Sequence, residues 1–363
     1  MNAFQIALNQ PYKYTCLKLI NHEMKNNFRL TALIFLLTAA VHAQTIYVDA
    51  INGNDKNTGA KDAPFKSIIA AVDTANKLSA NEAITVILKS GTYVLEDRVD
   101  VNPLAVFDVE KRFTITAEIL PGDKDWELAK MPVVLSTSGY NSKFIFEHAA
   151  GFLINTSHVS IKGIKFLGNP NPSVGYYYPI TKPNKMYTDL EVSQCVFVGD
   201  KEAGKIQGAV WIQGKNNKVE HSVFYGCRNA ILFFDDVAGM QITNNIIAKS
   251  YESAFWFPQE DVDVTFKNNI LLDNEYVVVK PDMNFSSVWE NSLLLNNANF
   301  AGKWSREEQK ILELKKSGIP EKNITRKGNA ALILNEETLP ENDHLQLKEG
   351  SAGAELKAGL FKE

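Results

Sequence analysis

A set of polar side chains in the second half of the chain combines the residue types needed for an elimination beside a carboxylate group. An arginine can neutralise such a carboxylate, because its planar guanidinium matches the two oxygens. A lysine or tyrosine can then remove the neighbouring proton, and a general acid assists the departing oxygen. Each residue alone would also be an ordinary solvated turn residue. The residues that we predict for catalysis are Arg228, Lys249, Tyr251, Glu252 and Lys280.

A second group of candidates is acidic. Its carboxylates follow neighbouring predicted strands at similar offsets, so successive turns could bring them together. Oxygen ligands of this kind are those that Ca²⁺ prefers. The sequence therefore allows a calcium site, and solvated turn acids are the alternative. The candidate ligands are Asp235, Asp236, Glu260 and Asp261, with Asp263 and Asp282 nearby.

Two tryptophans lie in short apolar runs that we predict as strands. If Val210 and Phe255 point into a core, the two-residue alternation of a strand points Trp211 and Trp256 outward. Outward aromatic rings favour contact with the apolar faces of sugar rings, since exposed apolar patches often mark binding sites. A covering loop is the alternative. The same alternation turns these residues outward: Gln213, Leu232, Phe234, Val278 and Lys280.

The segment 169–189 is longer than its counterparts elsewhere in the chain. It carries three consecutive tyrosines and several prolines, and it also contains Lys185 and Tyr187. Long ordered loops on a rigid scaffold often carry binding function. We predict that this segment overhangs a groove and that Lys185 and Tyr187 bind an anionic sugar. The alternative is a surface loop without a binding role.

Internal repeats predict the architecture that positions these residues. Six segments align, each with apolar ends and a turn at its middle pair, and their starts lie 23 to 31 residues apart. This period, with three short strands in each repeat, is typical of a parallel β-helix, in which stacked coils bury one continuous core. We expect equivalent residues about 4.8 Å apart, with Gln194, His221, Asn244, Asn268 and Asn291 stacked in one slot. The segments are 161–166, 192–197, 219–224, 242–247, 266–271 and 289–294.

The ends of such a solenoid need covers, because open strand edges invite aggregation. Near the start we predict a helix that opens at Pro64 and has one apolar face, formed by Phe65, Ile68, Ile69, Val72 and Ala75. Near the end we predict a helix over 306–317 with Ser305 as its N-cap. The expected layout is a single domain over 44–363, with a cap at 44–100, coils at 101–300 and a second cap at 301–363.

Three opening segments carry a resemblance to a known group of proteins. They are IYVDAINGND at 46–55, PFKSI at 64–68 and TVILKSGTY at 85–93. They resemble the opening of exported right-handed parallel β-helix proteins of the pectate-lyase-like superfamily. The resemblance implies an all-β, right-handed parallel β-helix and, for most enzymes of this kind, an acidic polysaccharide as substrate; some relatives also use Ca²⁺. A fold shared by lyases, hydrolases and binding proteins does not choose among them.

With this resemblance, the polar set at 228–280 predicts a carbon–oxygen lyase that acts on uronate-containing oligo- or polysaccharide and leaves a 4,5-unsaturated sugar. The leaving group could be the next sugar or a hydroxyl group, so a polysaccharide lyase and a dehydratase both remain open. Two alternatives also remain: a glycoside hydrolase and a non-catalytic glycan-binding β-helix. For the hydrolase, two carboxylates would be drawn from Asp235, Asp236, Glu252, Glu260 and Asp261.

The first 43 residues are predicted to be absent from the mature protein. Met24 is the better initiator, a basic segment follows it, and residues 30–41 are apolar. Small residues then precede Gln44, as at a secretory cleavage site. The apolar run is shorter than the roughly 20 residues of a membrane span. We therefore expect an exported protein, periplasmic or secreted, without a membrane anchor.

Composition narrows the class further. The chain of 363 residues is 45% hydrophobic and 22% charged, a composition that excludes a disordered protein. Its net charge of −4 gives no indication of a basic surface that would bind nucleic acid. Only Cys195 and Cys227 remain after residue 43, too few for a disulfide framework. We expect two buried free thiols and a monomeric protein.

Overall fold

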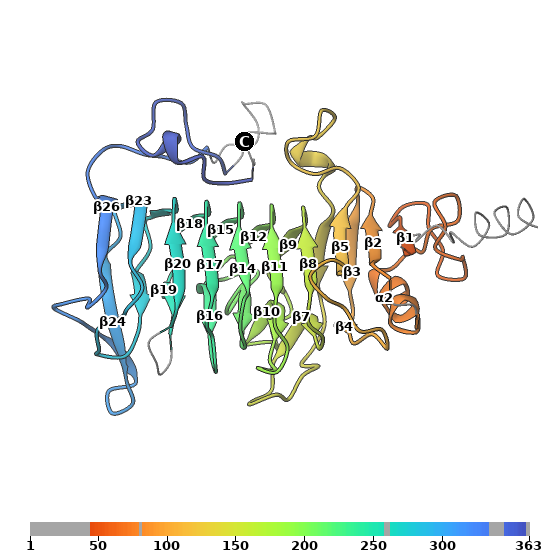
Figure 1. Ribbon diagram of the computed structural model, residues 1–363, viewed down its shortest axis with the longest axis horizontal. Helices are drawn as coiled ribbons and strands as arrows, with labels where there is room; N and C mark the ends of the chain where they lie inside the picture. The colour runs from red at the N-terminus through yellow and green to blue at the C-terminus, as the bar shows by residue number, and fades with distance from the viewer. Residues whose placement is uncertain (1–43, 80–81, 258–261, 334–344, 361–363) are drawn as a thin grey trace, which may run out of the picture. The chain divides into compact units, whose positions relative to one another are not determined.

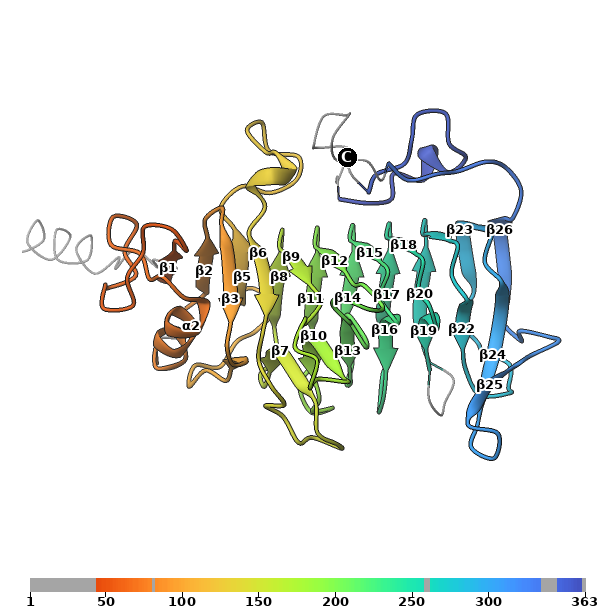
Figure 2. The same cartoon turned by 180° about the vertical axis from the view of Figure 1, so that it is seen from behind.

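Short parallel strands dominate the computed structural model, which describes residues 44–79, 82–257, 262–333 and 345–360. The chain winds through three stacks, so that equivalent strands of successive coils are hydrogen-bonded neighbours (Figures 1 and 2). The fold is a right-handed parallel β-helix, as the sequence predicts. The described residues belong to one unit, Ala43–Glu363. The predicted export signal lies in residues 1–43, outside the described residues.

The strands divide among the stacks as follows. The first stack contains β1 (Gln44–Val48), β2 (Ile84–Leu88), β5 (Phe113–Ala117), β8 (Val159–Lys162), β11 (Leu190–Ser193), β14 (Lys218–Glu220), β17 (Met240–Thr243), β20 (Val264–Lys267), β23 (Trp289–Leu295) and β26 (Glu321–Thr325). The second contains β3 (Thr92–Leu95), β6 (Val133–Ser136), β9 (Lys165–Leu167), β12 (Val196–Val198), β15 (Val223–Tyr225), β18 (Ile246–Ala248) and β21 (Ile270–Leu272), and it ends on the second half of β23. The third contains β4 (Val99–Val101), β7 (Ala149–Ile154), β10 (Tyr177–Lys182), β13 (Val210–Ile212), β16 (Asn229–Phe233), β19 (Ser253–Trp256), β22 (Tyr276–Val279), β24 (Asn299–Ser305) and β25 (Lys310–Glu313).

The register of the stacks confirms the repeat alignment. The six predicted starts are direct partners along the first stack: Ile161, Val192, Val219, Ile242, Phe266 and Trp289. The six ends are partners along the second stack: Phe166, Phe197, Phe224, Ile247, Leu271 and Leu294. The hydrophobic repeat in the sequence therefore correctly predicts which residues of successive coils are paired.

The core is one continuous apolar interior in which like residues lie on like residues. Phe166, Phe197 and Phe224 stack with ring centroids 5.0 and 4.8 Å apart. Cys195 and Cys227 are both buried and free, as expected. Burial raises the pKa of each thiol to about 12, so both remain protonated at neutral pH.

The front of the solenoid is covered by α2 (Ile68–Asn76), which contacts β1, β2 and β4. The helix begins later than predicted. The Ser67 hydroxyl caps it by accepting from the Ala70 N–H at 3.1 Å, while Phe65 pairs with Val48 in a bridge. Across the described ranges, no helix combines the length and apolarity needed to cross a bilayer.

The predicted helix over 306–317 is wrong. Strands β24 and β25 form an antiparallel hairpin there, with Trp304 opposite Ile311. The Ser305 hydroxyl does accept from the Glu308 N–H at 3.2 Å, as a helix cap would. However, Gln309 takes a left-handed conformation with φ of 51° and reverses the chain after one turn. Pairing along the sheet edge thus overrides the helical preference of the residues between them.

The segment 169–189 was predicted as an overhanging loop, but its middle is β10. All six residues of this strand are buried, and Ile180 pairs with Val210 in the next coil. Because the prolines and tyrosines resemble loop composition, the sequence conceals a strand that continues the third stack.

The slot predicted to hold stacked amides has a different role. Gln194, His221, Asn244, Asn268 and Asn291 all have left-handed backbone, with φ between 44° and 57°. They form the turns between the first and second stacks, a conformation that asparagine tolerates better than most residues.

The asparagine ladder lies one residue later. The Asn245 amide donates to the Asn269 side-chain oxygen at 3.1 Å, and the Asn269 backbone N–H donates to the Ser292 hydroxyl at 3.0 Å. A second ladder joins Asn274 to Asn297 at 2.8 Å. These buried amides satisfy turn backbone groups that would otherwise be unpaired inside the coil.

The C-terminal segment returns along the outside of the coils (Figure 1). The Gln194 amide donates to the Leu360 carbonyl at 3.0 Å, and the Asn244 amide donates to the Leu356 carbonyl at 3.0 Å. The His221 ring nitrogen lies 3.2 Å from the Gly359 carbonyl. The turn residues of the slot thus hold the segment across an apolar stripe. The stripe includes Val196, Val223, Ile246, Ile270 and Leu293.

Candidate active site

Two adjoining pockets open over the outer side of the third stack. The polar pocket, about 570 Å³, is lined by Arg228, Tyr251 and Glu252 together with Lys201 and Glu275. The aromatic pocket, about 830 Å³, is lined by Tyr178, Trp256 and further rings. Because the two pockets share lining residues, we describe them together as the groove. The shared residues are Gln207, Arg228, Glu252, Trp304 and Gln309.

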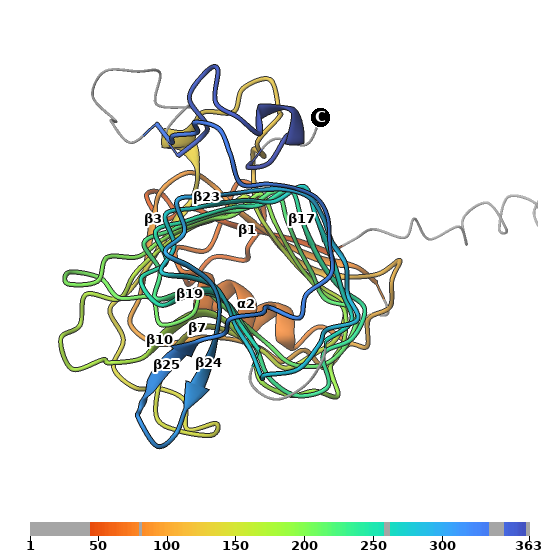
Figure 3. The ribbon, with the colours of Figure 1, turned by 90° about the vertical axis from the view of Figure 1, so that its left-hand side faces the viewer.

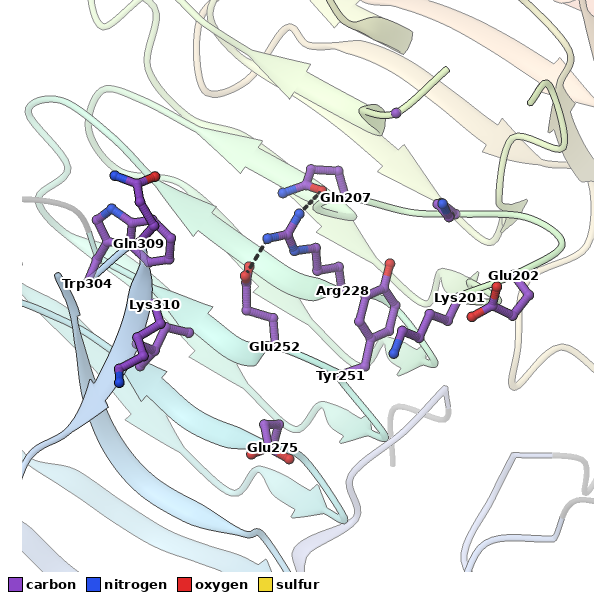
Figure 4. A pocket seen from close by; sticks show the side chains of 13 residues that line it. Lys201, Glu202, Gln207, Arg228, Tyr251, Glu252, Glu275, Trp304, Gln309 and Lys310 are labelled. Atoms are coloured by element: carbon purple, nitrogen blue, oxygen red, sulfur yellow. Dashed lines mark hydrogen bonds and ion pairs between the residues drawn. The ribbon is translucent and has the colours of Figure 1, made fainter. Parts of the chain in front are cut away.

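A row of polar side chains forms the floor of the polar pocket. The register pairs Asn229 with Ser253 and Ser253 with Tyr276. The residues one position earlier are Arg228, Glu252 and Glu275, and Gln207 precedes them on the coil before. Four consecutive coils therefore place one polar side chain each at the same position, about 4.8 Å apart. We call Gln207, Arg228, Glu252 and Glu275 the polar row (Figure 4).

Arg228 is held within this row by its two neighbours. One guanidinium nitrogen donates to the Gln207 side-chain oxygen at 3.1 Å, and the other donates to a Glu252 carboxylate oxygen at 2.6 Å. The second Glu252 oxygen accepts from the Asn229 amide at 2.8 Å, and Asn229 in turn accepts from the Ser253 hydroxyl at 2.6 Å. This network fixes the guanidinium, which remains about one third exposed to the groove.

The guanidinium of Arg228 keeps its positive charge within the network. Burial opposes the charge of Arg228, but the hydrogen bond and the charge of Glu252 outweigh it and raise the pKa of the guanidinium. Four cations line the polar pocket against three carboxylates, so the pocket suits an anionic group. The cations are Lys201, Lys205, Arg228 and Lys310.

Tyr251 lies beside Arg228 on the rim of the polar pocket (Figure 4). Burial raises the pKa of its phenol to about 12, and the charge of Arg228 only partly opposes this rise. The Lys201 amino group lies 5.8 Å from the centroid of the ring. At neutral pH, Tyr251 is therefore a proton donor.

The two tryptophans predicted to contact sugar differ in their surroundings. Trp256 is half-buried and lines the aromatic pocket, where it lies 5.9 Å from Trp304 by ring centroids. Trp211 is fully buried, because Phe146 stacks on it at 5.8 Å and Tyr178 contacts it edge-on at 4.9 Å. Trp211 therefore supports the floor of the groove and does not contact a ligand directly.

Lys280 lies outside the groove, and the outward orientation predicted for it and for Val278 is wrong. The register pairs Val278 with core residue Phe255, and Val279 with Trp256, so the prediction was displaced by one position. Lys280 is 2% exposed. Its amino group donates to the Pro281 and Met283 carbonyls at 2.8 and 2.6 Å.

The remaining predicted residues lie at other turns. Lys249 has left-handed backbone and its amino group lies 5.5 Å from the centroid of the Tyr225 ring. Lys185 pairs with Asp235 at 3.8 Å. The carbonyls of Gln213 and Tyr187 accept from the amino group of buried Lys182, and burial lowers the pKa of Lys182 to about 7. None of Lys185, Tyr187, Gln213 and Lys249 lines either pocket.

The acidic candidates are dispersed. Asp235 and Asp236 pair with Lys185 and Lys215, and Asp282 pairs with Lys303. Glu260 and Asp261 lie outside the described residues. In the part of the chain that the structure describes, no three of the His, Cys, Asp and Glu side chains are grouped as metal ligands.

Several groove residues escaped the sequence analysis. Gln207 and Asn229 precede apolar runs that were recognised, so alignment of the third stack alone could have found them. Trp304 and Gln309 were hidden by the predicted helix. Tyr140 and Phe146 come from the loop before β7, which shares no pattern with the coils, whereas Tyr176 belongs to the predicted segment 169–189 and does line the aromatic pocket.

Fold and groove together define a right-handed parallel β-helix protein with an open cleft on its third stack. Within this class, the chain belongs to the NosD family, described as "Periplasmic copper-binding protein (NosD)", whose family model matches residues 127–328. No curated protein matched the chain.

Solved structures that are similar to this chain are distant from it in sequence. A pectin methylesterase from Aspergillus niger is 12% identical, with 82% of this chain and 94% of that chain covered and a TM-score of 0.50. A pectin methylesterase in complex with a hexasaccharide is 11% identical, with 86% and 95% covered and a TM-score of 0.45. A rhamnogalacturonan lyase is 12% identical, with 82% and 64% covered and a TM-score of 0.35. At such identities the likeness concerns the fold alone.

The copper of the family description can be tested against the donors in this chain. Copper favours imidazole and sulfur ligands. His148 is buried among aromatic rings, with one ring nitrogen 2.9 Å from the Phe146 carbonyl. His158 pairs with Asp189 at 2.7 Å, and both cysteines lie in the core. Within 44–79, 82–257, 262–333 and 345–360, these donors are too dispersed to form a copper site, and we derive no step through a metal.

Proposed function

We propose that this protein is an exported carbon–oxygen lyase that binds a uronate-containing oligo- or polysaccharide in the groove and breaks a C4–O bond by β-elimination. The observation that carries the proposal is the fixed and partly exposed guanidinium of Arg228 at the centre of the groove. Such a group would bind the uronate carboxylate through two charge-assisted hydrogen bonds.

The role of Arg228 follows from the chemistry of the uronate. Neutralising the carboxylate makes the proton on C5 more acidic, because the negative charge that develops in the transition state is stabilised. Gln207 and Glu252 hold the guanidinium in place before the substrate arrives. This preorganisation avoids a cost of reorganisation during the reaction.

The proton transfers involve two further groove residues. The C5–H bond breaks and its proton goes to a base, for which Glu275 is our candidate because it lies in the polar row and is exposed. The C5–H electrons form the C4–C5 double bond as the C4–O bond breaks. The Tyr251 phenol donates its proton to the departing oxygen, since burial keeps that phenol protonated.

Two observations support the proposal that the protein is exported. The sequence before Gln44 has the pattern of a secretory signal, and the family is described as periplasmic. A periplasmic or secreted enzyme would encounter polysaccharide fragments from outside the cell.

The proposal is tested by following ultraviolet absorbance while the protein acts on polygalacturonate, alginate and their oligosaccharides. Wild-type protein should produce the rising signal of a conjugated enoate, and product masses should separate chain cleavage from loss of water. Arg228→Ala should lower kcat/KM by about 100-fold or more, the scale of losing a group that stabilises transition-state charge. Arg326→Ala, which removes another arginine–glutamate pair on the C-terminal strand, should leave the rate unchanged.

A glycoside hydrolase is the second candidate, favoured by the position of Glu252 and Glu275 on adjacent coils. Two carboxylates about 5 Å apart are the arrangement of a retaining glycosidase. The lyase is preferred because both Glu252 oxygens are engaged by Arg228 and Asn229. New reducing ends without enoate absorbance would favour the hydrolase, and saturable sugar binding without any product would favour a binding protein.

A further inference from the structure

We infer that the groove is walled at both ends and therefore receives the end of an acidic oligosaccharide chain, with the β24–β25 hairpin as the element that determines this specificity. For the reaction itself the inference rests on the proposed function. The binding mode can be tested without turnover. Figure 3 shows the hairpin and the loop before β7 projecting on the same side of the coils.

The first wall consists of the loops before β7 and β10. Tyr140, Phe146 and Glu147 from one loop, and Tyr176 from the other, line the aromatic pocket. The loops are fastened to each other, because the Gly175 N–H donates to the Tyr140 hydroxyl at 3.0 Å.

Further hydrogen bonds hold this wall to the coils. The Asn169 amide donates at 3.4 Å to the hydroxyl of Ser136, the last residue of β6. The Asn141 side-chain oxygen accepts from the N–H of Ala150, in β7, at 2.8 Å. The wall is therefore part of the folded structure before any ligand binds.

The second wall is the hairpin. Trp304, Gln309, Lys310 and Ile311 line the polar pocket, although they come from the coil furthest from the first wall. The pairs Gly302–Glu313 to Ser305–Lys310 keep the hairpin extended, and the contact between Trp304 and Trp256 anchors it to the floor. Figure 4 shows the hairpin residues at one side of the polar row.

The space between the walls is short. Strands β13, β16, β19 and β22 lie between β10 and β24 in the third stack. From β10 to β24 there are five strand intervals, about 24 Å, and the polar row from Gln207 to Glu275 spans three of them, about 14 Å. A long polysaccharide lying along the solenoid axis would meet one wall or the other, whereas the terminal few sugars of a chain could enter from above.

The walls also specify what kind of chain end binds. A charged sugar is recognised at Arg228, and a neighbouring sugar would lie on the rings of Trp256, Phe234 and Trp304 in the aromatic pocket. Aromatic rings give apolar contact area at a low cost in side-chain entropy. The groove thus selects an acidic unit next to a sugar with an exposed apolar face.

The test uses a shortened hairpin in the full chain. Residues 304–311 are replaced by Asn-Gly, which joins Lys303 to Leu312 where these residues already face each other; Asn-Gly favours two-residue hairpin turns. Lys303→Ala is the matched control, because Lys303 is on the hairpin but lines neither pocket. Trp304→Ala keeps the wall and removes one contact. Thermal unfolding checks that every variant is folded.

Binding is measured by calorimetry on polygalacturonate before and after partial hydrolysis to shorter chains at constant sugar mass. Wild-type protein and Lys303→Ala should show more sites in proportion to the number of chain ends. Trp304→Ala should bind about 10-fold more weakly with the same dependence. The shortened hairpin should lose the dependence on chain ends. The inference would be overturned if the number of sites on polygalacturonate for wild-type protein did not change with fragmentation. It would also be overturned if wild-type protein bound neither polygalacturonate nor alginate.

Turnover distinguishes this inference from the proposed function. If an enoate forms, wild-type protein should release one short product size from the start, and the shortened hairpin should release a mixture. Mixed sizes from wild-type protein would contradict the walled groove but leave the lyase intact. Binding to chain ends without any enoate would contradict the lyase but support the walls.

Discussion

At the scale of single residues, Arg228 and Tyr251 gain their chemical character from neighbours that are distant in sequence. Gln207, 21 residues earlier, and Glu252, 24 residues later, hold the guanidinium, and burial keeps the phenol of Tyr251 protonated. The sequence predicted Arg228, Tyr251 and Glu252 as candidates, and the structure brings them together in one pocket. The sequence alone could not show that Lys280 lies outside this pocket, because a shift of one position in the strand register reverses which face a side chain occupies.

The role of Tyr251 as an acid leads to a pH prediction. A proton donor is active while protonated, and the pKa of Tyr251 is raised to about 12. The value of kcat should therefore not fall between pH 8 and 10, as it would for an ordinary tyrosine with a pKa near 10. Tyr251→Phe should lower kcat by about 100-fold or more with little change in KM. A kcat that rises with pH over this range in wild-type protein would instead indicate that Tyr251 is the base.

At the scale of elements, the coils depend on polar ladders as well as on the apolar repeat. Asn268 and Asn269 are adjacent but differ in role: Asn268 takes the left-handed turn conformation, and Asn269 is fully buried in the ladder. The sequence predicted a ladder but assigned it to the first asparagine of each pair. Since both residues of the pair suit a turn, only the backbone conformation determines which side chain points inward.

Two substitutions test the ladder. Asn269→Ala should lower the free energy of unfolding by about 1–3 kcal/mol, because it leaves buried partners on Asn245 and Ile242 unsatisfied. Asn268→Gly should change it by less than about 0.5 kcal/mol, since glycine adopts the left-handed conformation readily. Urea-induced unfolding of the two variants measures the contrast, and equal losses would show that the turn conformation alone matters.

The hairpin shows where prediction of an element fails. Residues 306–313 consist largely of helix-favouring types, and Ser305 does cap one turn. The third stack, however, presents an open edge at β24, and pairing with β25 satisfies that edge. The open edge exists only because the preceding coils have formed, so no local window of the sequence predicts the hairpin.

At the scale of the whole molecule, the solenoid has a side with the groove and a side covered by the C-terminal segment. The groove lies on the third stack, and the C-terminal segment covers the apolar stripe outside the second stack. The period of the repeats predicted the coil and its core. The sequence predicted only a cap over 301–363 and not the return of the C-terminal segment along the coils, since the apolar residues of this segment are few and widely spaced.

The covering segment should contribute to stability. Leu360 is fully buried against the stripe, so Leu360→Ala should lower the free energy of unfolding by about 2–5 kcal/mol. Leu104→Ala, at a residue that is 73% exposed, is the control and should be nearly neutral. Thermal and urea unfolding provide the measurement, and a neutral Leu360→Ala would show that the segment is not stably docked.

The central claim is that Arg228 recognises a carboxylate in the groove, and calorimetric binding tests it most directly. The ligands are galacturonate oligosaccharides and their methyl esters, in which a small methyl group removes the charge presented to the guanidinium. Wild-type protein should bind the acid at least about 10-fold more tightly than the ester, and Arg228→Ala should bind the two equally. An equal affinity in wild-type protein, or a preference for the acid that persists in Arg228→Ala, would contradict the account.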